Sequence, residues 1–501
     1  MQRLTREILF DSDNLSQNLA QKSVRGGMTT MGSQGVGFVL GIASTAVLAR
    51  LLAPADYGLI GMVMVVVGFA AMFKDAGLSM ATVQKERITH EQISTLFWIN
   101  LCLSVVLVLC VLTVAPLVSL FYGKPELTPV TAALSASFLI SGLTIQHQAL
   151  FQRHMRFGML ASIQIASQVI TLIVTISLAV LGWRYWALVG GSLASVLVAS
   201  LLTFLFCPWI PGRMQKSTGV RDMLKFGGHL TGFDFVNYFS RNADNILIGK
   251  FIGTDALGLY SRAYSLFMMP ISQIRGPLVS VAFPVLSSLR TQPERYARYY
   301  RRLLETISFL TMPMAVYCAI EAEFLIRLLL GSAWLGVVPV FRILAIVGMV
   351  QASETTRGVV LMSCGLSKRY FYWGLFNAIL CIISFIAGLP FGIEGVATAY
   401  AIASYAILIP SLFYCFNKTP VSVSLFLRTL AWPTVTSFSA GALVIVLKWV
   451  WPSESILSHG VAALLFCAVC VGFATQIQTI RDTLTIILRS VLRPPETRLG
   501  N

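Results

Sequence analysis

Charge is scarce in this chain. Only 12% of its 501 residues are Asp, Glu, Lys or Arg, whereas 56% are hydrophobic, and the mean hydropathy is +0.77. Soluble domains carry about a quarter charged residues, so this composition cannot supply the polar surface that a soluble fold of this length needs. The sequence therefore predicts an all-α integral membrane protein with little mass outside the lipid.

Several motifs that catalysis or cofactor binding would require are also absent. The chain has no Gly-rich phosphate loop followed by Lys-Ser/Thr and no His/Glu pair spaced to share a metal. His147 and His229 are isolated, which is typical of packed or interfacial side chains. No outer loop is long enough to hold a catalytic centre. We expect no metal and no other cofactor, and the absences favour a transporter over an enzyme.

What the chain has instead is a series of apolar runs long enough to cross a membrane as helices. We predict fourteen spans, at 27–49, 57–83, 93–120, 129–151, 157–182, 185–207, 223–249, 257–285, 302–326, 337–363, 370–389, 393–416, 429–451 and 456–480. Residues 1–26 then form a cytoplasmic or interfacial segment, 208–222 a cytoplasmic linker and 481–501 a cytoplasmic tail. All other connections are short.

The basic residues support this count and give an orientation. With the N-terminus placed in the cytoplasm, every cluster of Lys and Arg falls on the cytoplasmic side, which is the side that the positive-inside rule favours. The outer side holds one basic residue per loop: Arg50, Lys124, Arg184, Lys250, Arg327 and Lys448. Both termini are therefore expected inside, and the net charge of +16 is a topology signal rather than a sign of nucleic-acid binding.

One turn sequence occurs twice in the chain. "ARLLAPADYGLIG" from Ala49 and "GKFIGTDALGLYS" from Gly249 share a basic residue, an apolar pair and a Gly-Leu at an offset of 200 residues. Because this offset corresponds to six spans, the two copies have the same orientation. We therefore predict two pseudo-symmetric six-helix bundles, at 27–207 and 223–416, related by an axis along the membrane normal, with the helices of 429–480 added.

The span before each turn carries a polar or small stripe at helical spacing. In the first copy it comprises Gln34, Gly37, Gly41 and Ser44, and in the second Asp234, Asn237, Arg241 and Asp244. Small residues are typical of close helix packing, but charges on a membrane helix line water or find partners. We therefore predict that Gln34, Ser44 and Asn237 line a polar cavity together with the charged side chains of the second copy.

Further charges within spans are candidates for function. Arg262 and Arg275 have no acidic neighbour in sequence, which favours them as anion ligands. Glu354 and Arg357 lie three residues apart and form either an internal ion pair or part of the cavity. Asp244 either binds a coupling ion or pairs with Arg241, one turn away. The alternatives stay open at this stage.

Four stretches resemble a known family. "VLARLLAPADYGLIGMV", "KDAGLSMATVQ", "NADNILIGKFIGTDALGLYSRAYSL" and "PLVSVAFPVLSSL" are similar to signatures of the polysaccharide transporter family, and especially of its Wzx-type exporters of colanic acid and other exopolysaccharides. The family belongs to the MOP superfamily, with the multidrug extruders (MATE proteins) and the lipid II flippase. The resemblance covers residues about 20 to 420.

The resemblance implies a flippase of the bacterial plasma membrane. Such a protein moves undecaprenyl-pyrophosphate-linked oligosaccharides outward by alternating access, for the synthesis of exopolysaccharide or lipopolysaccharide. A basic cavity suits the pyrophosphate, and we assign its binding to Arg241, Arg262, Arg275 and Arg357. Asp244, Asp234 and Glu354 are the candidates for coupling to Na⁺ or H⁺. Other expected partners are membrane lipids and the polysaccharide polymerase machinery.

Two alternatives remain. A drug/cation antiporter of the same superfamily should have a net acidic cavity, which the arginines of the second bundle disfavour. A membrane glycan polymerase or ligase usually needs a large outer loop, which the predicted topology lacks.

Overall fold

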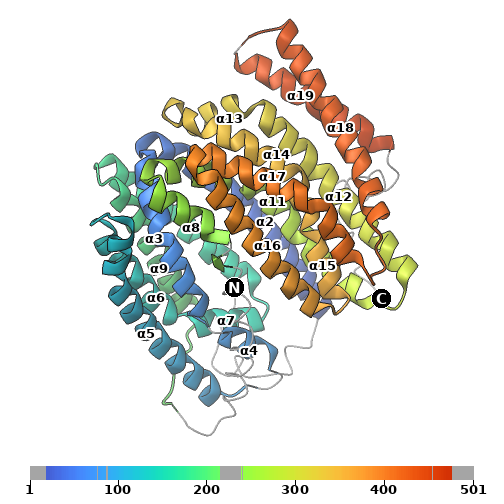
Figure 1. Ribbon diagram of the computed structural model, residues 1–501. Coiled ribbons are helices and arrows are strands. Elements are labelled where there is room, and N and C mark those ends of the chain that lie inside the picture. Colours follow the sequence, from blue (N-terminus) through green and yellow to red (C-terminus); the bar gives the residue numbers. More distant parts are fainter. Residues whose placement is uncertain are drawn as a thin grey trace. The chain divides into compact units, whose positions relative to one another are not determined.

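The computed structural model describes residues 19–75, 77–85, 88–214, 238–239, 241–453 and 455–476 (Figure 1). Every regular element in these ranges is a helix, and none of the described residues forms a strand. The all-α prediction is therefore confirmed. The chain divides into two compact units, Met1–Ser261 with Leu328–Trp334 (unit 1) and Arg262–Arg327 with Leu335–Asn501 (unit 2). The predicted bundle limits, 27–207 and 223–416, stay a prediction.

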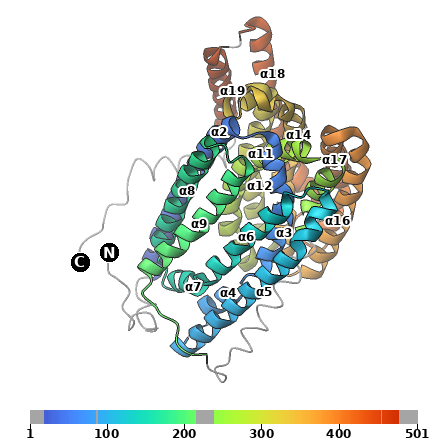
Figure 2. The same cartoon turned by 90° about the vertical axis from the view of Figure 1, so that its left-hand side faces the viewer.

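Unit 1 is built from long helices that pack side by side. Its elements are α2 (Leu19–Leu51), α3 (Pro54–Phe73), α4 (Leu78–Gln84), α5 (His90–Tyr122), α6 (Leu127–Gly142), α7 (Ile145–Arg153), α8 (Phe157–Val180), α9 (Tyr185–Phe206), the helical residues 241–251 and the first turns of α11 (Thr254–Ser288). The helix α8 packs against both α2 and α9, and α5 packs along α6 (Figure 2).

Local sequence signals set the helix ends in unit 1. Pro54 stands at the start of α3, where its missing N–H costs nothing, and the Asp56 carboxylate accepts a hydrogen bond from the Ala53 amide at 3.1 Å. Thr89 and Gln92 form a capping box at the start of α5, which ends at Gly123 with a φ of +69°. These signals separate α3 from α2 and α6 from α5.

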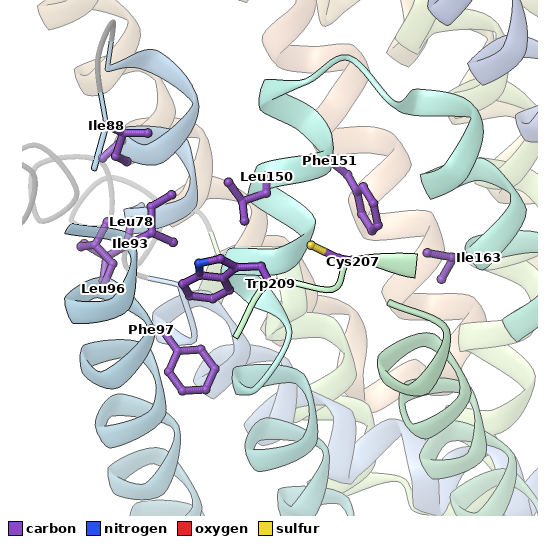
Figure 3. Packing of buried hydrophobic residues seen from close by; sticks show 11 residues of the cluster. Leu78, Ile88, Ile93, Leu96, Phe97, Leu150, Phe151, Ile163, Cys207 and Trp209 are labelled. Atoms are coloured by element: carbon purple, nitrogen blue, oxygen red, sulfur yellow. The ribbon is translucent and has the colours of Figure 1, made fainter. Parts of the chain in front are cut away.

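An apolar cluster closes one end of unit 1. It joins residues of α4, α5, α7 and α8 to the segment that follows α9 (Figure 3). Trp209 of that segment is fully buried beside Phe97, donates its indole N–H to His90 Nδ1 at 3.1 Å, and accepts a hydrogen bond from His147 Nε2 at 3.1 Å. His147 is thus a packed histidine, and the segment after α9 is held firmly against the helices.

Unit 2 is centred on α12, which packs between α14 and α18. Its elements are the remainder of α11, α12 (Pro293–Ile320), most of α13 (Ala322–Leu329), the end of η1 (Ser332–Val337), α14 (Val338–Glu354), α15 (Thr356–Ser363), α16 (Ser367–Gly388), η2 (Leu389–Phe391), α17 (Gly392–Phe416), α18 (Val423–Val450) and α19 (Ile456–Gln476). α11 stays one continuous helix although Pro270, Pro277 and Pro284 lie inside it.

A buried carboxylate fastens the last two helices to the rest of unit 2. Glu321, directly after α12, is 1% exposed, and its Oε2 lies 2.8 Å from Lys448 Nζ of α18 and 2.8 Å from His459 Nδ1 of α19. His459 also stacks on Phe324 with a centroid distance of 3.8 Å. α19 packs mainly on α18, so this cluster gives it a direct attachment to the preceding helices.

Eleven helical segments of the described chain are long and apolar enough to cross a membrane, or twelve if the bent pair α6–α7 forms one span. One of the eleven, Ser367–Phe416, contains two helices, α16 and α17. The predicted span 223–249 lies mostly outside the described residues. The structure therefore supports a multi-pass membrane protein, while the count of fourteen stays a prediction.

Candidate functional site

An ion pair in unit 2 whose two side chains are both buried joins Glu354 and Arg357 at the break between α14 and α15. Arg357 Nη2 lies 3.3 Å from Glu354 Oε2, and its Nε donates to the Glu354 carbonyl at 2.9 Å. Both side chains are about nine-tenths buried, and the Arg357 guanidinium lies 5.8 Å from the centre of the Trp373 ring. The structure contains the internal ion pair, which was one of the two alternatives, and a place for these residues in the cavity stays a prediction.

This pair is incompletely satisfied. Arg357 Nη1 and Glu354 Oε1 are buried and form no hydrogen bond with any described residue. A buried polar atom without a partner costs about 1–3 kcal/mol, and more if it is charged. The pair therefore retains one donor and one acceptor that a polar ligand or water can satisfy.

Hydrogen bonds between side chains hold this region of unit 2 in place. Tyr300 of α12 pairs with Thr356 at 2.8 Å, and Ser308 pairs with Ser353 at 2.8 Å. All four residues are buried, so α12 is tied to α14 and α15 on both sides of the ion pair. Sequence reasoning missed Tyr300 and Ser308. The only signal was their spacing of eight residues, which places polar groups on one face of an apolar helix.

Asp244 is a buried carboxylate of unit 1, as is Asp56 of the first turn. Asp244 is 6% exposed, and its two oxygens accept hydrogen bonds from the Asn245 amide at 2.8 Å and from the Tyr260 hydroxyl at 3.1 Å. Within the described part of the chain, no ion pair joins it to Arg241, whose side chain is exposed. Tyr260 belongs to the repeated turn, but sequence reasoning did not identify it as the partner of Asp244.

The two copies of the repeated turn contact each other within unit 1. A Cβ on Gly58 would lie 1.8 Å from the Thr254 carbonyl oxygen, and a Cβ on Gly258 would lie 1.9 Å from the Pro54 carbonyl oxygen. Since 58 and 258, and likewise 54 and 254, are equivalent positions, the contact is reciprocal. Only glycine permits backbones to approach so closely.

The matching basic residues make equivalent contacts as well. Arg50 Nη2 donates to the carbonyl of Leu328, at the end of α13, at 3.1 Å. Lys250 Nζ donates to the carbonyl of Phe121, in the last turn of α5. Cations favour the carbonyl end of a helix, where the macrodipole is negative. Each turn therefore supplies a positive charge to the end of a third helix.

The other predicted site residues are spread over both units. In unit 1, Gln34 is exposed and Ser44 is half-buried. In unit 2, Arg262 and Arg275 are half-buried on α11. Asp234 and Asn237 lie outside the described residues. The structure thus brings together Glu354 with Arg357 and Asp244 with Tyr260.

Comparisons with known proteins place this chain among polysaccharide biosynthesis proteins. The family described as "Polysaccharide biosynthesis protein" matches residues 47–339. The teichuronic acid biosynthesis protein TuaB of Bacillus subtilis is 29% identical over 67% of this chain and 70% of its own length. The lipopolysaccharide biosynthesis protein WzxC of Escherichia coli is 23% identical over 74% of this chain and 76% of its own length.

A solved structure shares the fold. The lipid II flippase MurJ, in an inward closed conformation, superposes with a TM-score of 0.72 over 94% of this chain and all of its own, at 15% identity. This confirms the superfamily fold that the sequence predicts. Since the family pattern covers more than half of the sequence, the chain belongs to the polysaccharide biosynthesis protein family.

Proposed function

We propose that this protein is a flippase that moves undecaprenyl-pyrophosphate-linked oligosaccharides across the bacterial plasma membrane, for extracellular polysaccharide or lipopolysaccharide synthesis. The observation that carries the proposal is the full-length match to the fold of a lipid flippase by a chain of a polysaccharide biosynthesis family. The relatives named for teichuronic acid and lipopolysaccharide biosynthesis support a glycan as the cargo.

The proposed route is alternating access between two pseudo-symmetric six-helix bundles, within fourteen spans and with both termini in the cytoplasm. The reciprocal contacts of Gly58 with Thr254 and of Gly258 with Pro54 support a two-fold relation between the repeats. Alkaline phosphatase fused after Lys124 or Arg184 should be active, and fusions after Arg213 or Arg295 should be inactive. The opposite result at any of these sites would refute the orientation.

The proposed ligands of the pyrophosphate are Arg241, Arg262, Arg275 and Arg357. A guanidinium binds two phosphate oxygens through its planar fork, which lysine cannot reproduce. The free Nη1 atom of Arg357 supports a ligand role for that residue, because the ion pair with Glu354 leaves this donor unused. Asp244, Asp234 and Glu354 are the proposed sites of Na⁺ or H⁺ coupling, and the burial of Asp244 supports this role for Asp244.

The test compares export with the amount of folded protein in the membrane. Arg262→Ala and Arg275→Ala should keep normal membrane levels, lose export and accumulate lipid-linked oligosaccharide on the cytoplasmic face, and Arg→Lys should restore export in part. Normal export by both Ala variants would exclude the anion site at these residues. Resistance to cationic drugs without any effect on glycan export would instead support the antiporter alternative.

Arg357→Ala has a different expected outcome. Removing one partner of a buried ion pair costs about 3–5 kcal/mol because the other charge stays buried, so this variant should lower the amount of folded protein. The double variant Glu354→Gln/Arg357→Met removes both charges and should restore folding. If it also restores export, Arg357 has only a structural role.

A further inference from the structure

The first turns of α12 have a defined inner face. Tyr296 and Tyr300 are fully buried, and their hydroxyls pair with Ser363 at 2.7 Å and Thr356 at 2.8 Å, both on α15. These two bonds, one helical turn apart, fix the rotation of α12 about its axis. The direction of every other side chain in these turns follows from them.

The opposite face carries three exposed arginines, Arg295, Arg298 and Arg302. Their spacing of three and four residues places them on one side of the helix. In the part of the chain that the structure describes, no carboxylate forms an ion pair with any of them. Arg295 Nη1 donates to the neutral amide oxygen of Gln292 at 2.8 Å, which leaves its charge uncompensated. Glu294, in the first turn of α12, is also exposed, so the three guanidinium groups form a surface of net positive charge.

Arg301, in the same turns, is a natural contrast. Its Nε lies 2.8 Å from the Glu305 carboxylate, one turn further along α12. Its charge is therefore balanced locally, although its side chain is 61% exposed. Arg295, Arg298 and Arg302, here called the arginine face, thus differ from Arg301 in charge balance. They do not differ from it in residue type, helix or depth.

The length of α12 places the arginine face at headgroup depth. The helix has 28 residues and is about 42 Å long at 1.5 Å per residue, whereas the hydrocarbon core is about 30 Å thick. The apolar part from Leu303 to Ile320 is about 27 Å long and accounts for most of the crossing. The turns from Pro293 to Arg302 therefore reach the layer where lipid phosphates lie.

A neighbouring turn adds to this positive surface. Arg290 Nη1 lies 3.4 Å from the position that a Cβ on Gly365 would take, so the turn before α12 lies against the turn before α16. Lys368 follows at the start of α16 and is exposed. The two connections therefore add basic side chains at the end of unit 2 where α12 begins.

We propose that Arg295, Arg298 and Arg302 form a binding surface for the headgroups of anionic phospholipids. A cluster of basic residues directly at a membrane helix attracts such lipids, and arginine grips phosphate oxygens in pairs. Basic residues that only set the topology of a membrane protein need neither share one helix face nor have a fixed orientation. These three arginines share one face of a helix whose rotation is fixed. None of the three arginines is among the proposed ligands of the transported pyrophosphate, and the surface retains the lipid around α12 whether or not the protein moves a glycan.

The test measures lipid preference directly. The full chain is reconstituted in vesicles of phosphatidylcholine with about a quarter phosphatidylglycerol, and spin-labelled forms of the two lipids report which one associates with the protein. The wild-type chain should prefer phosphatidylglycerol. Arg298→Gln should lower that preference by about fivefold, and the triple change of Arg295, Arg298 and Arg302 to Gln should abolish it. Raising the salt to about 1 M should weaken the wild-type preference.

The matched control is Arg301→Gln, which removes the same charge from the same turns but from a compensated pair. It should change the preference by less than about twofold. The thermal stability of each variant in pure phosphatidylcholine shows that folding is intact. An unchanged preference in the triple variant, or an equal loss in Arg301→Gln, would overturn the proposal. No transport is measured, so a failure here is distinguishable from a failure of the flippase function.

Discussion

The two copies of the repeated turn end and begin their helices at equivalent positions, but the side chains behind them differ. In the first copy α2 ends at Leu51 and α3 begins at Pro54, and in the second the helix 241–251 ends at Phe251 and α11 begins at Thr254. Behind the first turn stand Ser44 and Ile60, and at the equivalent positions of the second stand Asp244 and Tyr260, which are hydrogen-bonded. The second copy therefore has a buried carboxylate–tyrosine pair at the two positions where the first copy has a hydroxyl and an aliphatic side chain.

The glycines give the largest expected effect. Gly58→Val and Gly258→Val each force side-chain carbons into a carbonyl oxygen that a Cβ already approaches within 2 Å, so each should destabilise the protein by about 3 kcal/mol. The control is Gly276→Ala on α11, where a Cβ meets no atom within 4 Å, and which should be neutral or slightly stabilising. Membrane levels and thermal stability are measured. A large effect at only one of the two glycines would break the reciprocity.

Asp244 gives the next-largest expected effect, which is a loss of transport rather than a loss of stability. Asp244→Asn keeps the size of the side chain and its acceptor for Tyr260, so membrane levels should stay normal while ion-dependent export is lost. Ser44→Ala at the equivalent position of the first copy should change export by less than about twofold. Equal export by the Asn variant with a full and with a collapsed ion gradient would exclude a coupling role for Asp244.

The hydrogen bond between Tyr260 and Asp244 gives a second test of the difference between the copies. Tyr260→Phe removes the donor to one buried oxygen of Asp244 and should cost about 1–3 kcal/mol. The double variant with Asp244→Asn should lose less than the sum of the two single changes, because the residues act as a pair. Strict additivity of the measured stabilities would show that the hydrogen bond contributes little.

The smallest expected effect is that of changing Arg50 and Lys250, the basic residues at equivalent positions of the two turns. Arg50→Met and Lys250→Met each remove a donor to a helix end and should cost about 0.5–1 kcal/mol. Exchanging the types, Arg50→Lys and Lys250→Arg, should leave the thermal stability nearly unchanged. A loss of stability in only one of the Met variants would show that the two basic residues are not equivalent in function.

Periodicity and the repeat predicted much of this architecture, because both depend on residues close in sequence. The all-α class and the break in each helix pair follow from spacings of a few residues or from the constant offset. The spacing of Glu354 and Arg357 gave their ion pair as one of two alternatives. The burial of Asp244 was harder to assign, since the stripe suggested Arg241 as its neighbour and the structure supplies Tyr260 from the next helix.

The acceptors of Arg50 and Lys250 could not be predicted from sequence for a simple reason. Both are backbone carbonyls, of Leu328 and Phe121, and every residue type offers the same carbonyl. Trp209 illustrates a related limit, because its hydrogen bonds to His90 and His147 join segments more than sixty residues apart. Contacts between distant segments depend on packing, and a single sequence records no direct trace of them.

The reciprocal contact of the glycine turns also bears on how such a chain arises. When residue i touches residue j of a second copy and j touches i, the interface is the one that two identical subunits form around a two-fold axis. A half-length ancestor that paired with itself would need a single glycine to serve both sides of that axis. Duplication and fusion of such an ancestor would leave the two positions free to mutate independently. Residues 58 and 258 are both glycine where the backbones meet, whereas residues 50 and 250 differ as Arg and Lys.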